Sequence, residues 1–223
     1  MPDTSPVSGN DVLVFAAATE TEFHWLSAAP VMLATLVTFS SDAAAGLEAN
    51  HIPLLIDPAP GPDRPFGTLR GHVARANPLW RGFNADVEAL AIFQGPQGYV
   101  TPSWYPSKTQ HGKVVPTWNY AVVHAHGPLK IMDDAQWLRK LVTQLTESQE
   151  ARLDSPWQVT DAPPDYIDGM LKAIVGIEIP LTRLQGKWKL SQNRLPQDRD
   201  GVVKGLEQRA DDASRAMLAA FKP

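Results

Sequence analysis

GYVTPSWYPSKTQHGKVVPTWNY, residues 98–120, holds three of the four tyrosines and two of the seven tryptophans of the chain. The same stretch contains Pro102, Pro106 and Pro116. Tyrosine and tryptophan gain most when their rings are buried, and proline cannot donate a hydrogen bond to the ladder of a central strand. The combination predicts a stiff backbone that holds flat aromatic faces in place, as a wall for a planar ligand. An aromatic corner that closes the end of a β-barrel explains the stretch equally well.

The composition of the 223-residue chain is typical of a globular protein with a large core, because 43% of its residues are hydrophobic and 20% are charged. A net charge of −4 argues against a broad nucleic-acid surface but leaves room for a local basic patch. The chain has no cysteine, which excludes disulfides and is compatible with the reducing cytoplasm. The longest apolar stretch, residues 28–37, is shorter than the roughly 20 residues of a membrane helix. We therefore expect a soluble, cytoplasmic protein that does not enter a membrane.

Short runs of apolar and β-branched residues predict strands over much of the chain. The predicted strands are residues 31–39, 47–57, 68–76, 89–94 and 116–126, and a later hairpin pairs 177–184 with 187–191 through a turn at Gln185–Gly186. Alternation within 116–126 places Trp118 and Tyr120 on one face and Asn119 and Ala121 on the other.

Capping residues and helical periodicity predict helices mostly after residue 130. These helices are residues 133–150, 163–175 and 202–221, and a short one is expected at 19–29. Short strands followed by helices are typical of the α+β class, with an antiparallel β-barrel core rather than a parallel sheet.

Two groups of basic and polar residues suit an anion such as a phosphate. In the strand 187–191, alternation places Lys187, Lys189 and Ser191 on one face, where two ammonium groups and a hydroxyl meet. A solvated edge strand whose lysines discourage aggregation is the alternative. The other group is Arg70, His72, Arg75 and Asn77. Within it, Arg75 falls on the apolar face of the predicted strand, where a charge is costly unless it is paired. Arg75 therefore either binds an anion or forms a salt bridge with one of the 24 carboxylates.

Few motifs of known chemistry are present. The pair of histidines in HAH, residues 124–126, has no nearby carboxylate and is a weak metal signal, so we expect no metal site. His51 and His72 are expected to make hydrogen bonds near a ligand or the core. The absence of GxGxxG, P-loop and GxSxG motifs removes the usual evidence for a dinucleotide-binding Rossmann domain, an NTPase or an α/β-hydrolase.

Five stretches of the chain resemble the PaiB family of FMN-binding negative transcriptional regulators. They are ANHIPLLID (49–57), GTLRGHVARANPLW (67–80), AIFQGPQGYVTPSWYPSK (91–108), VPTWNYAVVHAHG (115–127) and GKWKLSQNR (186–194). PTWNY and KLSQNR are specific in combination. Family members often begin with a Tyr-x-Pro-x-x-Phe segment, where this chain has DVLVFAAATETEF (11–23). We therefore expect residues 1–30 to be a variable N-terminal segment and residues 31–223 to be a single split-barrel domain with C-terminal helical additions.

The resemblance implies an FMN-binding split β-barrel, antiparallel and Greek-key-like with peripheral helices, which binds FMN at the interface of a homodimer. Arg75 and the nearby His72 would meet the phosphate. Lys187 and Lys189 would come from the partner subunit or close the same pocket, and Trp118 and Asn119 would lie beside the flavin ring. The cofactor-binding residues implied are His51, Arg70, His72, Arg75, Asn77, Thr117, Trp118, Asn119, Lys187, Lys189, Ser191 and Gln192.

The resemblance further implies a negative transcriptional regulator that acts indirectly or senses a redox state or a ligand. One alternative is a flavin-dependent oxidoreductase of the pyridoxamine-phosphate-oxidase or flavin-reductase type, for which the sequence names no catalytic residue. Another is a direct DNA-binding repressor without flavin. The acidic charge balance and the lack of a basic recognition helix argue against direct contact with nucleic acid without excluding it.

Overall fold

The computed structural model describes residues 31–42, 44 and 46–221, which pack as two compact units. Among the described residues, unit 1 comprises 94–122 and 186–221, and unit 2 comprises 31–93 and 123–185. The helix expected at 19–29 and the N-terminal segment 1–30 lie outside the described residues. The single domain expected over residues 31–223 stays a prediction.

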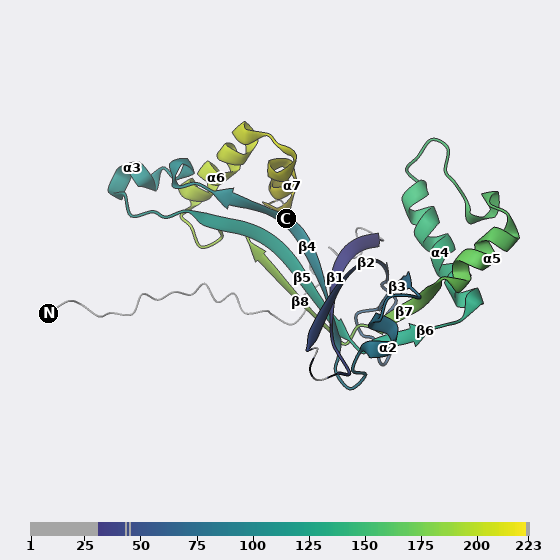
Figure 1. Ribbon diagram of the computed structural model, residues 1–223. Coiled ribbons are helices and arrows are strands. Elements are labelled where there is room, and N and C mark those ends of the chain that lie inside the picture. Colours follow the sequence, from purple (N-terminus) through teal and green to yellow (C-terminus); the bar gives the residue numbers. More distant parts are fainter. Residues whose placement is uncertain (1–30, 43, 45, 222–223) are drawn as a thin grey trace. The chain divides into compact units, whose positions relative to one another are not determined.

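Eight strands in the described part of the chain form one sheet, in the order β6-β7-β3-β2-β1-β4-β5-β8 (Figure 1). The pairings β1–β2, β1–β4, β2–β3, β3–β7 and β6–β7 are antiparallel. An antiparallel sheet combined with helices confirms the expected α+β class. The strands are β1 (Val31–Phe39), β2 (Leu47–Asp57), β3 (Thr68–Ala74), β4 (Ala89–Val100), β5 (Thr117–Gly127), β6 (Lys130–Met132), β7 (Ile174–Pro180) and β8 (Arg183–Lys189).

The described helices of more than five residues all follow residue 130, as the sequence predicts. No helix among the described residues is both long enough and apolar enough to cross a bilayer. The helices are α2 (Leu79–Gly82), α3 (Ser107–His111), α4 (Ala135–Glu150), α5 (Pro164–Lys172), α6 (Pro196–Arg209) and α7 (Asp212–Phe221), with the 3-10 turns η1 (Pro102–Trp104) and η2 (Val159–Asp161).

Strands β1 and β2 have the bounds that the sequence predicts. Their side chains alternate between the core and the other face of the sheet, and this alternation is visible in the sequence. Ala34 and Leu36 of β1 are fully buried, and their partners across the ladder are Ile52 and Asn50 of β2. Residues of the same parity as Ala34 therefore fill the interior of unit 2, and the residues between them lie on the opposite face.

Helix α4 is fixed at its first turn and along one side. The side chain of Asp134 accepts a hydrogen bond from the backbone N–H of Trp137 at 2.7 Å, which caps the helix. The indole of Trp137 then packs against β7 at Gly176, where an added Cβ would lie 2.3 Å from Cζ3 of the ring. Glycine at this position lets the helix approach the sheet.

The predicted late hairpin is wrong, because β7 pairs with β3 and β6 whereas β8 lies beside β5 in the sheet. Gln185 and Gly186, the predicted turn, lie inside β8, and the chain turns at Leu181 and Thr182 instead. The backbone N–H groups of Leu181 and Thr182 donate to the carbonyls of Gly67 at 2.9 Å and His126 at 3.0 Å. Contacts with two distant segments therefore fix the turn.

Two helix predictions are also corrected. The helix predicted at 163–175 ends at Lys172, and Ile174 and Val175, which the prediction placed in the helix, begin β7. The single helix predicted at 202–221 is two helices, because Ala210 adopts a left-handed conformation with φ 53° after α6. The carboxylate of Asp211 then accepts a hydrogen bond from the N–H of Ser214 at 2.7 Å in the first turn of α7.

Unit 1 has its own small core. Its buried residues are Val100, Tyr105, Leu190, Val202, Leu206 and Met217, contributed by β4, the segment after η1, the residue that follows β8, α6 and α7. The aromatic stretch 98–120 thus contributes directly to a hydrophobic core through Tyr105, which is 2% exposed.

Candidate functional site

The predicted cofactor-binding residues fall into two groups, one in each unit. Those in unit 2 are His51, Arg70, His72, Arg75 and Asn77, and those in unit 1 are Thr117, Trp118, Asn119, Lys187, Lys189, Ser191 and Gln192. Each group has its own geometry within its unit.

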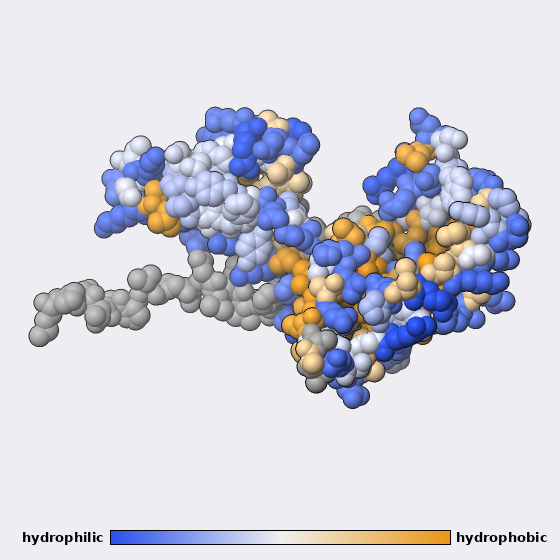
Figure 2. Space-filling view, viewed as in Figure 1, coloured by the Kyte–Doolittle hydropathy of each residue, from blue (hydrophilic) through white to orange (hydrophobic). Residues whose placement is uncertain are grey.

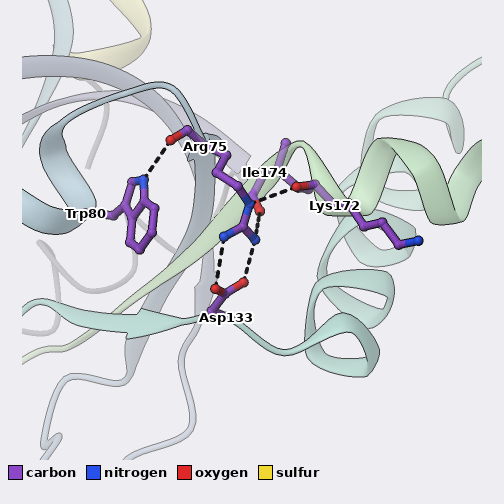
Figure 3. A network of polar contacts seen from close by, with 5 residues as sticks. All are labelled: Arg75, Trp80, Asp133, Lys172 and Ile174. Carbon is purple, nitrogen blue, oxygen red and sulfur yellow. Dashed lines mark hydrogen bonds and ion pairs between the residues drawn. The ribbon is translucent and has the colours of Figure 1, made fainter.

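Arg75 lies just beyond β3 at the centre of a network of polar contacts (Figure 3). Its Nη1 and Nη2 donate to the two carboxylate oxygens of Asp133 at 3.0 and 2.5 Å. Its Nε donates to the carbonyl of Lys172 at 2.8 Å, and Nη2 also donates to that of Ile174 at 3.0 Å. The guanidinium therefore joins the end of β3 to the start of α4 and the end of α5.

Of the two expectations for Arg75, an anion site or a salt bridge, the structure shows the salt bridge, with Asp133. The side-chain hydrogen bond with Asp133 raises the pKa of the arginine and lowers the pKa of the carboxyl group. The ring of Trp80 lies 5.5 Å from the guanidinium carbon, and its N–H donates to the backbone carbonyl of Arg75 at 2.9 Å. A phosphate at Arg75 would compete with a bidentate carboxylate, and phosphate binding by this residue stays a prediction.

Arg70 is also paired with carboxylates. Its Nε lies 3.0 Å from Glu178 of β7, and its Nη2 lies 3.1 Å from Asp57 at the end of β2. His72, two residues along β3, has a buried Nδ1 without a hydrogen-bond partner, and burial lowers the pKa of its imidazole. On β3, the positive charge of Arg70 is therefore balanced by two carboxylates, and burial favours the uncharged form of the His72 imidazole.

The remaining unit 2 residues have different surroundings. Asn77 supports the local backbone: its Nδ2 donates to Oδ1 of Asn50 at 2.8 Å, and its Oδ1 accepts from the N–H of Leu79 at 2.9 Å. His51 is exposed on β2, opposite Thr35 of β1. Its imidazole is accessible to a partner molecule.

In unit 1 the two specific motifs of the sequence meet. Asn119 of PTWNY is 0% exposed and Ser191 of KLSQNR is 3% exposed. Asn119 Nδ2 donates to Ser191 Oγ at 3.1 Å, and the hydroxyl in turn lies 3.2 Å from Asn119 Oδ1. Alternation predicts Ser191 on the lysine face, which is wrong: β8 ends at Lys189, and a φ of 60° turns Ser191 inward.

Replacing Ser191 by alanine should lower the free energy of unfolding by about 1–3 kcal/mol, because it leaves the buried Asn119 amide without its partner. Urea unfolding followed by tryptophan fluorescence measures this change. Ser148→Ala is the control, since its hydroxyl bonds only to the carbonyl of Leu145 within α4. Equal, small losses for both variants would contradict a structural role for the Asn119–Ser191 pair.

The opposite side of β5 and β8 carries aromatic rings and ammonium groups. Trp118 is 49% exposed, its N–H donates to Gln97 at 3.1 Å, and its ring centroid lies 6.3 Å from that of Tyr99. Lys187 Nζ lies 5.8 Å from the centre of the Tyr120 ring. Lys189 shares this side by alternation and makes no hydrogen bond or ion pair within the described residues. We call Tyr99, Trp118, Tyr120, Lys187 and Lys189 the aromatic–lysine face.

The last two predicted residues flank this face. Thr117 is half-buried at the first position of β5. Gln192 closes a local turn, since its Oε1 accepts from the N–H of Leu190 at 2.7 Å and its amide group donates to the carbonyl of Trp188 at 2.5 Å. Gln192 therefore shapes the backbone that follows the two lysines.

Sequence reasoning missed several features of the two units. Tyr99 on the aromatic–lysine face was present in the opening stretch, but only its contact with Trp118 shows where it lies. A buried pair joins Ser107, 1% exposed, to Asp198, 3% exposed, through two hydrogen bonds of 3.1 and 2.6 Å. Unit 2 has a cavity of about 260 Å³, which several separate segments line: Arg75, Asp133, Ala135, Leu138, Asp168, Leu171 and Lys172.

The HAH motif has a structural environment of its own. Arg183 Nη2 lies 3.0 Å from Nδ1 of His126, and the Nε2 of this histidine is buried without a partner. Among the residues that the structure describes, no three histidine or acidic side chains lie close enough together to hold a metal ion.

Comparisons with known proteins agree with the sequence motifs. The model of the family described as "Putative FMN-binding domain" matches residues 14–183. An uncharacterized protein of Emericella nidulans is 38% identical over 199 residues, which cover 77% of this chain and 79% of that protein. Protease synthase and sporulation protein PAI 2 of Bacillus subtilis is 34% identical over 149 residues, which cover 67% of this chain and 69% of that protein.

A solved structure has a similar fold. The FAD and heme binding protein from Mycobacterium smegmatis superposes with a TM-score of 0.50 and 13% identity, and the match covers 78% of this chain and 72% of that one. Together with the antiparallel eight-stranded sheet, this likeness confirms the expected split β-barrel. On the family match and the identity to its relatives, the chain belongs to the PaiB-type family of FMN-binding domains.

Proposed function

We propose that this chain binds FMN through the aromatic–lysine face of unit 1 and works as a cytoplasmic homodimer. FMN is the cofactor of the family to which the chain belongs. The observation that carries the proposal is that the exposed Trp118 shares one side of β5 and β8 with two lysines that have no carboxylate partner within the described residues. The absence of cysteine is compatible with a reducing compartment.

The donor chemistry of this face fits the two parts of FMN. A dianionic phosphate is bound well by ammonium groups, and Lys187 and Lys189 supply two of them. The flat flavin ring stacks on aromatic side chains, which Trp118 and Tyr99 present at 49% and 46% exposure. In unit 2, by contrast, Arg70 and Arg75 already bond to carboxylates. Bound FMN would supply redox chemistry, while the protein residues hold and orient it.

Titration of the protein with FMN tests the proposal directly. We expect the flavin absorbance bands to shift, tryptophan fluorescence to be quenched, and the melting temperature to rise as FMN saturates one site per chain. A flavin spectrum that does not change, together with an unmoved melting temperature at saturating FMN, would refute it.

Variants of the aromatic–lysine face should weaken FMN binding. Trp118→Ala should raise the Kd about tenfold or more, because stacking on one aromatic ring contributes about 1–3 kcal/mol. Lys187→Met and Lys189→Met should each raise it about tenfold through the loss of a charge-assisted contact. The matched controls are Trp157→Ala, at a tryptophan that is 44% exposed in unit 2, and Lys113→Met, at an exposed lysine of unit 1. Controls that weaken FMN binding as much as the face variants would count against this site.

We further propose that the regulatory role is negative and indirect, through a ligand or a redox state that the flavin site senses. A net charge of −4 does not favour wide contact with DNA phosphates. In gel-shift experiments at low salt, the FMN-saturated protein should leave promoter DNA unshifted. A salt-dependent shift by the pure protein would favour direct repression instead.

A further inference from the structure

The cavity of unit 2 is formed by the segment after β3, the start of α4 and the last turns of α5. Its volume of about 260 Å³ lies just below the roughly 300–1,000 Å³ of pockets for drug-sized ligands, so it suits a molecule smaller than FMN. In Figure 2, hydrophobic surface gathers where α4 and α5 meet the strands, below their hydrophilic outer turns.

The floor of this cavity is apolar and firmly packed. Leu138 of α4 is 2% exposed and Leu171 of α5 is 5% exposed, and both line the cavity. They also belong to the small core between α4, η2 and α5, where they pack with Val159 and Ile167. Because other buried side chains support these two leucines from behind, the floor keeps its shape, and it favours contact with an apolar group over contact with water.

The charged residues around the cavity leave one cation in excess. The carboxylate of Asp133 bonds to Arg75, and that of Asp168 bonds to Arg139 of α4 at 2.5 Å. An arginine therefore balances each aspartate that lines the cavity. The ammonium group of Lys172 has no hydrogen-bond or ion-pair partner among the residues that the structure describes. One unpaired ammonium beside an apolar floor is complementary to a molecule with one negative charge and an apolar body.

The positions of the cations favour a carboxylate over a phosphate. Lys172 extends from the end of α5 away from the guanidinium of Arg75 (Figure 3), so the two cations do not converge on one point. Arg75 already donates four hydrogen bonds to Asp133 and to two backbone carbonyls, which leaves one of its five N–H groups. A second negative charge on the ligand would face the carboxylates of Asp133 and Asp168 without a cation of its own.

We propose that this cavity binds a small monocarboxylate with an aliphatic or aromatic body. The carboxylate bonds to the ammonium group of Lys172, and the apolar body lies on Leu138 and Leu171. The inference goes beyond the proposed function, because it gives unit 2 a ligand that differs in size and charge from the FMN proposed for unit 1.

Titration of the isotope-labelled full chain with benzoate, with and without FMN, tests this site by NMR. We expect saturable shifts of the backbone amides in the first turn of α4 and the last turn of α5. Benzyl alcohol has the same ring without the charge, and it should bind about tenfold more weakly because it lacks the charge-assisted contact. Phenyl phosphate, the matching dianion, should also bind more weakly than benzoate.

Two variants test the lysine and the cavity separately. Lys172→Met keeps the apolar stem, removes the ammonium group and should raise the benzoate Kd about tenfold. Its control is Lys140→Met, at an exposed lysine of α4 that does not line the cavity. Ala135→Leu enlarges an exposed residue that lines the cavity and should prevent saturable binding by filling the space. Its control is Gln136→Leu, at the next exposed position, which lies outside the lining.

Amide shifts that are absent, or that are confined to unit 1, would overturn the proposal. Benzyl alcohol or phenyl phosphate that binds at least as tightly as benzoate would do the same, as would Lys172→Met and Ala135→Leu variants that bind benzoate like their controls. The four substituted positions are exposed, and circular dichroism verifies that each variant is folded. Benzoate binding at the α4 and α5 amides supports the cavity even when FMN does not bind, which separates this proposal from the proposed function.

Discussion

Replacing Gly205 by alanine should destabilise the protein by about 2–3 kcal/mol, although the same change in an open helix is stabilising. A Cβ added to Gly205 of α6 would lie 2.2 Å from Cδ2 and 2.3 Å from Cε2 of Trp104. The indole cannot easily move away, because it packs on the unit 1 core and the guanidinium of Arg209 lies 5.3 Å from its ring centre. One turn earlier, Gly201 lies against the backbone, where a Cβ would be 2.0 Å from the carbonyl oxygen of Trp104.

The matched control is Gly169→Ala in α5, where an added Cβ meets nothing within 4 Å. Alanine there should raise the free energy of unfolding by about 0.5–1 kcal/mol, because it reduces the freedom of the unfolded chain. Urea unfolding of both variants shows whether the two changes have opposite signs. A Gly205→Ala protein that is at least as stable as the wild type would mean that α6 does not need the close approach to η1.

Strands β1 and β2 were the most predictable part of this fold. Residues 31–39 and 47–57 alternate between apolar and exposed positions, and the structure has β1 and β2 at those bounds. Asn119 illustrates the same principle in β5, since its parity assigns it to the face that the structure buries. The alternation of side chains along a strand depends only on neighbouring residues in the sequence, so it can be predicted without knowing which segments pack against the strand.

The corrected turn before β8 depends on distant partners. Gln185–Gly186 has the composition of a turn, but the chain turns where Leu181 and Thr182 find acceptors in other segments. The break between α6 and α7 falls on Ala210, a residue type that carries no left-handed signal. Sequence patterns express intrinsic preference, and at Leu181 and Thr182 long-range hydrogen bonds outweigh it.

The candidate site residues also have partners that lie far away along the chain. The residue types of Arg75 and Ser191 indicated polar chemistry, but their partners, Asp133 and Asn119, lie 58 and 72 residues away along the chain. Alternation correctly grouped Lys187 with Lys189, since both lie within β8. After Lys189, the last residue of β8, the alternation no longer holds, and the side chain of Ser191 is buried.

Acidification from pH 7.5 to 5.5 should destabilise the protein through three half-buried histidines. Burial lowers the pKa of His72, and burial followed by the charge of Arg183 lowers the pKa of His124 and of His126. The unfolded chain therefore takes up protons near the ordinary imidazole pKa of about 6.5, while the folded chain does not. Their stabilisation is complete above that value and is lost as the pH falls through it. Each imidazole contributes at most about 1.4 kcal/mol per pH unit.

The carboxylates do not obscure this window. Asp133, whose pKa is lowered mainly by its hydrogen bond with Arg75, loses its contribution only below the ordinary carboxyl range near pH 4. Urea unfolding at pH 7.5, 6.5 and 5.5 gives the slope of stability against pH.

The contacts of His126 explain why protonating its imidazole is costly, and they indicate which variants test the prediction. A guanidinium only donates hydrogen bonds, so Nδ1 of His126 accepts from Arg183 at 3.0 Å, and a proton on Nδ1 would break this contact. His126→Gln should remove one histidine's share of the slope. Arg183→Gln should reduce the slope as well, because it withdraws a charge that lowers the pKa of both His124 and His126. A stability that rises on acidification, or a slope that neither variant changes, would show that these imidazoles are not held neutral by the fold.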